Sequence, residues 1–389
     1  MDVTTEQPTT STQAPGSGAG EIRTFGGPAD HLNLSIHGLA TMRVDADAPS
    51  LDIIRSMFAP FVVDSPVGSP DIAIVRSHAL PSAPSHAEHD YRYDEHSVWI
   101  ADMDVQVRRT GDHRWIVSGT RELLTAVLPL VDEVTTRRGA AMIHATMVDL
   151  DGYGILMPAW GGVGKTSTMA KLMKVPGCHF MGDDWGFIDA TGRLLGYAKP
   201  MFIKPHHRPI YPHLFEGVRK PLVPSRMSKP ISKFTTLVHP LVTKYPSVAA
   251  FSRRWSPEHR MVTPQEAFPQ MDIATMSKLA VSVFVERHDG SACNLEPRSS
   301  EWMLDRLVGN FYSELPEHSR TVITALTATG ILPMHRSQAA KAAVVASGLG
   351  DVPCYLLKVP AEWSADRASD EISRQLLDLA RSATAERVQ

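Results

Sequence analysis

Apolar and polar residues alternate over short stretches in the first third of the chain, as they do in half-buried β-strands. The stretches predicted as strands lie at residues 32–36, 41–44, 97–100, 104–107 and 114–117, and 71–75 is a compact candidate for a buried strand. Two longer stretches, 51–61 and 121–136, carry apolar residues at helical spacing instead. The pattern predicts a small N-terminal α+β domain over residues 24–138, which supports the remainder of the chain or presents a substrate to it.

Residues 1–23 precede this domain and differ from it in composition. They are rich in Thr, Pro, Ser and Gly and offer almost no apolar surface to bury. Because such a segment cannot offset the entropy lost on folding, we expect a disordered tail.

Apolar runs are longer in the second part of the chain. Two runs, 142–150 and 153–157, flank Asp151 and Gly152, a dipeptide suited to the positive φ angles of a tight hairpin. A continuous run at 279–285 predicts a strand in the middle of a sheet. Short strands are expected at 178–181 and 354–358, and helices at 300–313, 319–329, 337–347 and 364–387. Together these elements predict an α/β domain over residues 139–389.

A glycine-rich octet follows the predicted hairpin. Residues 159–166 read Ala-Trp-Gly-Gly-Val-Gly-Lys-Thr, which fits the P-loop pattern with alanine in place of the usual first glycine. An apolar strand precedes the octet and a helical pattern follows it, as a P-loop requires. The predicted nucleotide-binding residues here are Ala159, Trp160, Gly161, Gly162, Val163, Gly164, Lys165, Thr166 and Ser167.

The chemistry of this loop follows from its residue types. Glycines allow backbone N–H groups to converge on phosphate oxygens, and the N-terminus of the next helix adds its positive end. Lys165 supplies a cation for the β- and γ-phosphates, and the Thr166 hydroxyl is suited to bind Mg²⁺. The octet therefore predicts binding of ATP with Mg²⁺. The alternative is an ordinary glycine-rich turn with an exposed lysine.

Two adjacent carboxylates end the strand predicted after the P-loop helix. Asp183 and Asp184 follow Gly182. In an extended segment their side chains point to opposite faces, so one can face Mg²⁺ and Thr166 while the other accepts a proton from an acceptor hydroxyl. The alternative is a solvated Gly-Asp-Asp turn.

Residues 199–260 form a basic segment that prolines interrupt repeatedly, with Glu216 and Glu258 as its acidic residues. It is interpreted either as a lid or acceptor-binding flap that offsets phosphate charge, or as a solvated basic surface. Lys204 and Arg208 lie closest in sequence to the P-loop site, and we predict that they contact the nucleotide. Nucleic-acid binding is disfavoured, because few aromatic residues are interleaved with the charges.

Composition narrows the class of protein further. The net charge of −3 argues against general binding to nucleic acid or to acidic membranes. Cys178, Cys293 and Cys354 lack metal-ligand spacing, and a sparse, odd number of cysteines is typical of a reducing compartment. The sequence shows neither an apolar run long enough to span a bilayer nor a signal peptide. We therefore expect a cytoplasmic protein.

The sequence pattern alone predicts no functional role for the histidines. A lone histidine on a strand, such as His144, is usually structural. Four further histidines lie in a polar stretch and are more often solvated than metal-bound: His78, His86, His89 and His96.

With these motifs assembled, residues 142–189 resemble HPr kinase/phosphorylase and its relatives, a branch allied to phosphoenolpyruvate carboxykinase. The resemblance rests on the order Ile-His-Ala, strand, Asp-Gly, strand, P-loop, helix, Gly-Asp-Asp. It implies an α/β P-loop kinase core, with Asp183 as catalytic base beside His144, Lys165 in the catalytic P-loop, and Asp184 with Thr166 on the Mg²⁺ side. Ser167 stands where bifunctional members carry Glu, and a Gly-Arg-Asn-type segment is not found, which favours a kinase without phosphorylase activity.

The sequence thus predicts an ATP-dependent kinase that transfers the γ-phosphoryl group to a hydroxyl. A Ser or Thr of a peptide or protein is the preferred acceptor, and a small-molecule hydroxyl is the alternative. A non-catalytic nucleotide-dependent binding protein belongs to a second class. A carboxykinase-like lyase is disfavoured, because neither a second metal site nor an oxaloacetate-binding arginine is found. Since relatives form oligomers, a homo-oligomer is compatible with the resemblance.

Overall fold

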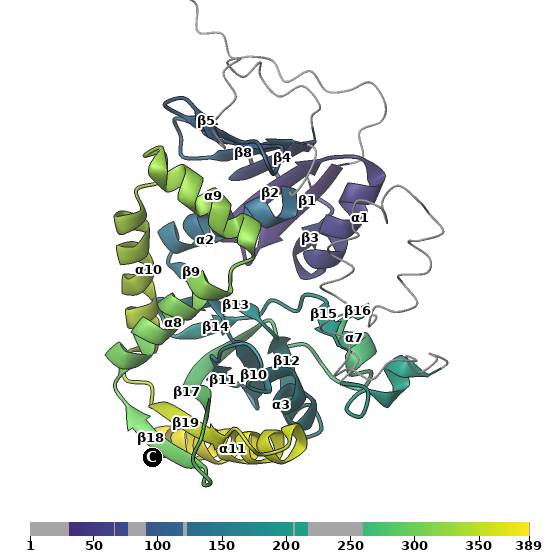
Figure 1. Cartoon of the computed structure of the whole chain (residues 1–389), viewed down its shortest axis with the longest axis vertical. Coiled ribbons are helices and arrows are strands. Elements are labelled where there is room, and N and C mark those ends of the chain that lie inside the picture. The colour runs from purple at the N-terminus through teal and green to yellow at the C-terminus, as the bar shows by residue number, and fades with distance from the viewer. Residues whose placement is uncertain are drawn as a thin grey trace, which may run out of the picture.

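The computed structural model describes residues 31–65, 67–76, 91–119, 123–204, 207–216 and 260–388. This part of the chain is a mixed α/β protein with two large sheets (Figure 1). The predicted tail 1–23, the histidines His78, His86 and His89, and most of the basic segment lie outside the described residues. Among the helices that are described, none is both long and apolar enough to cross a bilayer.

The first sheet contains the six strands that the sequence pattern predicts and two short strands, at 62–63 and 91–93, that it does not. They are β1 (His31–Ile36), β2 (Ala40–Asp45), β3 (Val62–Val63), β4 (Ile72–Arg76), β5 (Tyr91–Tyr93), β6 (Ser97–Ile100), β7 (Val105–Arg109) and β8 (Trp115–Gly119). Their order is β3-β1-β2-β4-β8-β7-β6-β5. The pairs β2–β4 and β4–β8 are parallel, and the other neighbours are antiparallel. Helices α1 (Ala48–Met57) and α2 (Leu123–Arg137) and the 3-10 turn η1 (Ala59–Phe61) bury apolar residues in the same core.

The second sheet contains, near its middle, the strand that precedes the glycine-rich octet. Its strands are β9 (Ala140–His144), β10 (Thr146–Leu150), β11 (Tyr153–Met157), β12 (Cys178–Gly182), β13 (Trp185–Asp189), β14 (Arg193–Leu195), β17 (Met276–His288), β18 (Asn294–Arg298) and β19 (Cys354–Pro360). The main order is β12-β10-β11-β17-β14-β13-β9, and β19 pairs with β17 and β18. Because β11, β17 and β19 run parallel, their carboxyl ends meet at one edge, where the P-loop begins.

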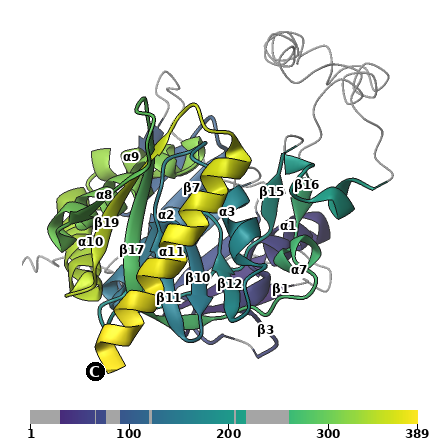
Figure 2. The same ribbon diagram turned by 90° about the horizontal axis from the view of Figure 1, so that it is seen from below.

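Helices cover both faces of this sheet. One face packs against α3 (Lys165–Leu172) and α11 (Ala365–Val388), which lie side by side in Figure 2. The other face packs against α8 (Ser300–Glu314) and α10 (Met334–Leu349). Ile155 and Leu156, neighbours on β11, enter the two different cores, as strand alternation requires. The remaining described elements are α7 (Pro264–Ala267), α9 (Glu317–Ala328), η3 (Pro212–Phe215) and the two-stranded ribbon of β15 (Met201–Ile203) and β16 (Arg260–Val262).

Two long strands of the second sheet bend at the same place. The run 142–150, predicted as one strand, is instead broken at Ala145, so that β9 pairs with β13 while β10 pairs with β12. The strands that pair with it, β12 and β13, are separated by a bend at Asp183 and Asp184, and Asp184 has a left-handed φ of 83°. Irregularities of this kind re-aim side chains and are frequent next to active sites. The bend gathers side chains from both strands at one point.

The two predicted domains, 24–138 and 139–389, contribute residues to one hydrophobic core. Apolar residues of the first sheet and of α2 are buried in the same cluster as Phe187 on β13, Phe311 on α8 and Val322 on α9. Figure 1 shows α9 beside α2, although more than a hundred residues separate them in the chain. The first sheet is therefore packed against the second sheet and its helices. A domain boundary near residue 138 remains a prediction.

Candidate functional site

The glycine-rich octet forms the turn between β11 and α3. Val285 on β17 donates a backbone hydrogen bond to Pro158 O across 3.1 Å, which fixes the start of the turn to the neighbouring strand. Gly162 and Gly164 have φ angles of 83° and 119°, which disfavour any residue with a side chain. A Cβ added at either glycine would meet no atom within 4 Å, so the loop is open at these positions. An open backbone turn at a helix N-terminus is suited to hold phosphate oxygens.

Two side chains already bind the backbone of this loop. Lys165 Nζ donates to Ala159 O at 2.7 Å and to Trp160 O at 3.3 Å. Glu314, the last residue of α8, accepts a hydrogen bond from the N–H of Gly161 at 3.1 Å. Sequence reasoning missed Glu314, because the contact joins residues far apart in the chain. Its carboxylate binds an N–H group of the kind that a P-loop offers to phosphate.

Asp183 lies against the start of the P-loop helix. Its Oδ2 accepts a hydrogen bond from Thr166 Oγ1 at 3.2 Å, and its Oδ1 accepts one from Thr146 Oγ1 at 2.9 Å. Only 5% of Asp183 is exposed. Burial raises the pKa of Asp183 to about 6, and the charge of Asp184 acts in the same direction. The predicted carboxylate and the predicted magnesium-binding hydroxyl are therefore in contact.

Asp184 points to a different group of residues. Lys199 Nζ donates to its Oδ2 at 3.1 Å, and His144 Nε2 lies 3.9 Å from its Oδ1. The Asp184 side chain is 38% exposed, whereas that of Lys199 is 5% exposed. Burial acts to raise the pKa of Asp184, but the charge and hydrogen bond of Lys199, together with the charge of Lys165, outweigh it and hold the pKa below its usual value. Asp184 is thus an ionised, accessible carboxylate with a buried cation behind it.

His144 is neutral and its tautomer follows from its neighbours. Burial lowers its pKa to about 3, and the charge of Lys165 contributes to the shift. The amide nitrogen of Asn310 donates to His144 O at 2.7 Å and lies 3.2 Å from His144 Nδ1. An amide nitrogen can only donate, so Nδ1 accepts and the ring proton is on Nε2. That N–H faces Asp184.

Side chains from three helices form hydrogen bonds with backbone groups of β9, the strand that carries His144. β9 ends the strand order of the second sheet, which leaves backbone groups on its outer side to be paired. Asp132 on α2 accepts from Met142 N at 2.9 Å, and Lys341 on α10 donates to Met142 O. Asn310 on α8 binds His144 O. Sequence reasoning missed these residues, although a charged residue on the apolar face of a predicted helix was a detectable sign for Asp132 and Lys341.

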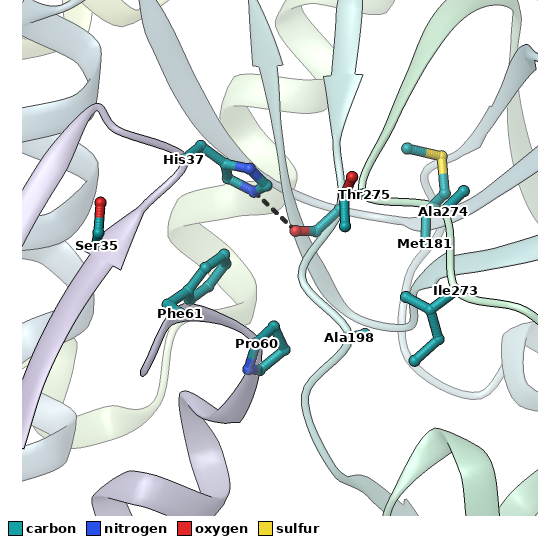
Figure 3. Close-up of a pocket in the computed structure, with 10 residues that line it drawn as sticks. Ser35, His37, Pro60, Phe61, Met181, Ala198, Ile273, Ala274 and Thr275 are labelled. Atoms are coloured by element: carbon teal, nitrogen blue, oxygen red, sulfur yellow. Dashed lines mark hydrogen bonds between the residues drawn. The ribbon is translucent and has the colours of Figure 1, made fainter. Parts of the chain in front are cut away.

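The segment that carries Lys199 is anchored to the first sheet. His37 Nε2 donates to Gly196 O at 2.8 Å, and Tyr197 Oη donates to Met57 O at 3.0 Å. Figure 3 shows His37 directed at this segment across a pocket of about 150 Å³, with Phe61 and Met181 among its lining residues. The N-terminal segment therefore supports the backbone that presents Lys199 to Asp184. Lys199 was known from the sequence only as the first residue of the basic segment.

The two basic residues predicted to bind nucleotide have contacts within their own stretch of chain. Lys204 is exposed, and its backbone N–H lies 3.4 Å from His207 Nδ1. Arg208 donates to Phe215 O at 3.4 Å and lies over the Phe215 ring. Their contact with a nucleotide stays a prediction. Tyr211, from the same stretch, does reach the P-loop helix, because its hydroxyl donates to Thr166 O at 3.2 Å.

The described residues contain no group of three or more His, Cys, Asp or Glu that could hold a metal ion by themselves. A site with fewer than three such side chains is compatible with Mg²⁺, which proteins often bind through one or two carboxylates together with substrate phosphates. Comparison of the sequence with protein-family models and with curated proteins finds no match to either.

Proposed function

We propose that the protein is an ATP-dependent phosphotransferase that moves the γ-phosphoryl group to a hydroxyl acceptor. In this proposal residues 139–389 form a P-loop kinase core of the type found in HPr kinase and phosphoenolpyruvate carboxykinase. A Ser or Thr in a peptide or protein is the preferred acceptor. A small-molecule hydroxyl is the alternative.

The observation that carries the proposal is the contact between Asp183 and Thr166. The chain has a loop suited to a triphosphate, and the buried carboxylate of Asp183 reaches the first turn of the helix that begins at Lys165. An ordinary glycine-rich turn has no need for a buried carboxylate at this point. Phosphoryl transfer uses carboxylates beside such a loop, both to hold Mg²⁺ next to the phosphates and to orient the nucleophile and accept its proton.

The proposed reaction uses the chain's own groups in a defined order. The N–H groups of residues 161–166 and the Lys165 ammonium group bind the β- and γ-phosphates. A carboxylate of the Asp183–Asp184 pair accepts the acceptor's hydroxyl proton as its oxygen bonds to the γ-phosphorus. The bond from the γ-phosphorus to the β,γ-bridging oxygen breaks, and ADP leaves. Lys165 then offsets the charge that develops on ADP.

The residues present fit Mg²⁺ as the companion of the nucleotide. Thr166 and a carboxylate of the Asp183–Asp184 pair supply hard oxygen ligands. Bound there, the ion would offset phosphate charge during transfer.

The test is transfer of labelled γ-phosphate from ATP to a panel of Ser- and Thr-containing peptides and hydroxylated small molecules. Labelled product should form with wild-type protein and be absent with the Asp183→Asn, Asp184→Asn double variant. Consumption of ATP should depend on the acceptor. Tight MgATP binding without transfer to any member of the panel would instead favour the nucleotide-dependent binding protein.

A further inference from the structure

The two adjacent carboxylates lie in different surroundings, which indicates different roles in the proposed reaction. Asp183 is in contact with two threonine hydroxyls, one of them on the P-loop helix. Asp184 contacts Lys199 and faces the Nε2–H of His144. The division between the two carboxylates comes from the bend at Asp184, whose left-handed backbone turns its side chain away from that of Asp183.

We propose that Asp183 is the metal-side carboxylate and that Asp184, positioned by Lys199, is the carboxylate that faces the acceptor. This order is the reverse of the one that the family resemblance implies. The inference rests on the proposed function, because it concerns which carboxylate does which part of that reaction.

The metal-side assignment follows from the Thr166 contact. In P-loop proteins the hydroxyl after the loop lysine is a ligand of Mg²⁺. A carboxylate 3.2 Å from that hydroxyl is within reach of the same ion or of its bound water. Asp184 has its Oδ2 engaged by the Lys199 ammonium group, which repels a second cation at that oxygen.

The acceptor-side assignment follows from access. An acceptor hydroxyl must approach within hydrogen-bond distance of the base. Asp183 is 5% exposed, and each of its oxygens already accepts a threonine hydroxyl. The Asp184 side chain is 38% exposed, and its Oδ1 lies on the side of neutral His144. A hydroxyl from solvent therefore meets Asp184 before it meets Asp183.

Lys199 is a positioning residue in this arrangement. It is buried, and its Nζ has Asp184 Oδ2 at 3.1 Å and Pro200 O at 3.4 Å as partners. Its backbone N–H donates to Tyr197 O at 2.8 Å, within the segment that the first sheet anchors. The ammonium group therefore has a fixed place, and it fixes one oxygen of Asp184 while leaving the other free.

The experiment measures ATP affinity by calorimetry with Mg²⁺ and with EDTA, and the ratio of the two dissociation constants reports the metal site. In the wild-type protein Mg²⁺ should tighten ATP binding. Asp183→Asn should reduce this tightening by roughly 10- to 100-fold, as loss of a residue that supports a metal site does. Asp184→Asn and Lys199→Met should keep it. Melting temperatures establish that each variant is folded.

The Asp184→Asn result decides the matter even where Asp183→Asn does not fold. Loss of the Mg²⁺ effect in Asp184→Asn would overturn the assignment and restore the reverse order, with the proposed function intact. Failure of the wild-type protein to bind ATP under either condition would instead remove the proposed function itself.

Discussion

The hydroxyl of Thr166 donates a hydrogen bond to Asp183 Oδ2 across 3.2 Å. This contact joins the first turn of α3 to the bend between β12 and β13, although the helix and the bend are separate in the sequence. It places a buried carboxylate beside the lysine and the open glycines that suit a triphosphate. The proposed function depends on this relationship more than on any single motif.

Glu314 should compete with the nucleotide for the P-loop. Its carboxylate accepts the Gly161 N–H and brings negative charge to the loop that we propose binds phosphate. Glu314→Gln should therefore tighten ATP binding by up to about tenfold, since a hydrogen bond to a charged group is stronger than one to a neutral group by about 1–1.5 kcal/mol. Calorimetric titration with ATP measures the effect. Glu301→Gln, an exposed substitution at the other end of α8, is the matched control and should change nothing. Equal affinities for all three proteins would show that Glu314 does not oppose phosphate.

Asp132 and Lys341 form a buried ion pair, and removal of one partner should destabilise the protein more than removal of both. The two groups lie 2.5 Å apart, and 1% of the Lys341 side chain is exposed. Lys341→Met leaves a buried carboxylate without its cation and should lower the free energy of unfolding by about 3–5 kcal/mol.

The double variant Asp132→Leu, Lys341→Met should recover part of that loss, because no buried charge remains uncompensated. Chemical denaturation of the single and double variants gives the coupling between the two residues. Additive losses would mean that the pair is not coupled.

His144 should make the fold sensitive to acid. Its pKa is about 3 in the folded protein, against an ordinary value of 6.5. Between these pH values the unfolded chain binds a proton at His144 and the folded protein does not, so its contribution to stability falls as the pH is lowered from 6.5 towards 3. The slope is about 1.4 kcal/mol per pH unit.

His144→Asn should therefore flatten the acid limb of a plot of unfolding free energy against pH, relative to the wild-type protein. The exposed His96 offers a control, and His96→Asn should leave the curve as it is. A curve for His144→Asn that runs parallel to the wild-type curve would contradict a buried, neutral His144.

Local patterns were sufficient to predict most of the fold. The Asp151–Gly152 hairpin is confirmed, with φ angles of 51° and 90° at its two turn residues. The strand at 279–285 lies within the longer β17, between β11 and other strands as its apolar run predicts. The patterns failed at Ala145, where a run that reads as one strand is broken, because sequence periodicity carries no information about a bend imposed by partner strands.

The candidate site was predictable where its residues lie in one motif. Thr166, Lys165 and the two aspartates are close in sequence, and their types indicate their chemistry. Lys199 and Glu314 reach the site from distant elements, and only the packing of those elements brings them there. The family resemblance indicated which residues belong to the site, whereas the contacts of Asp183 and Asp184 led us to propose a different division of labour between them.

Binding of MgATP by wild-type protein and by Lys165→Met, compared in one calorimetric experiment, tests the central claim most directly. The account predicts saturable binding by the wild-type protein and an affinity about 10- to 100-fold lower for Lys165→Met, because the variant lacks the ammonium group that binds the β- and γ-phosphates. Lys174→Met, an exposed substitution just beyond the same helix, should bind as the wild-type protein does. Equal MgATP affinity in the wild-type protein and Lys165→Met, or no binding by either, would contradict the claim that this loop holds a nucleotide.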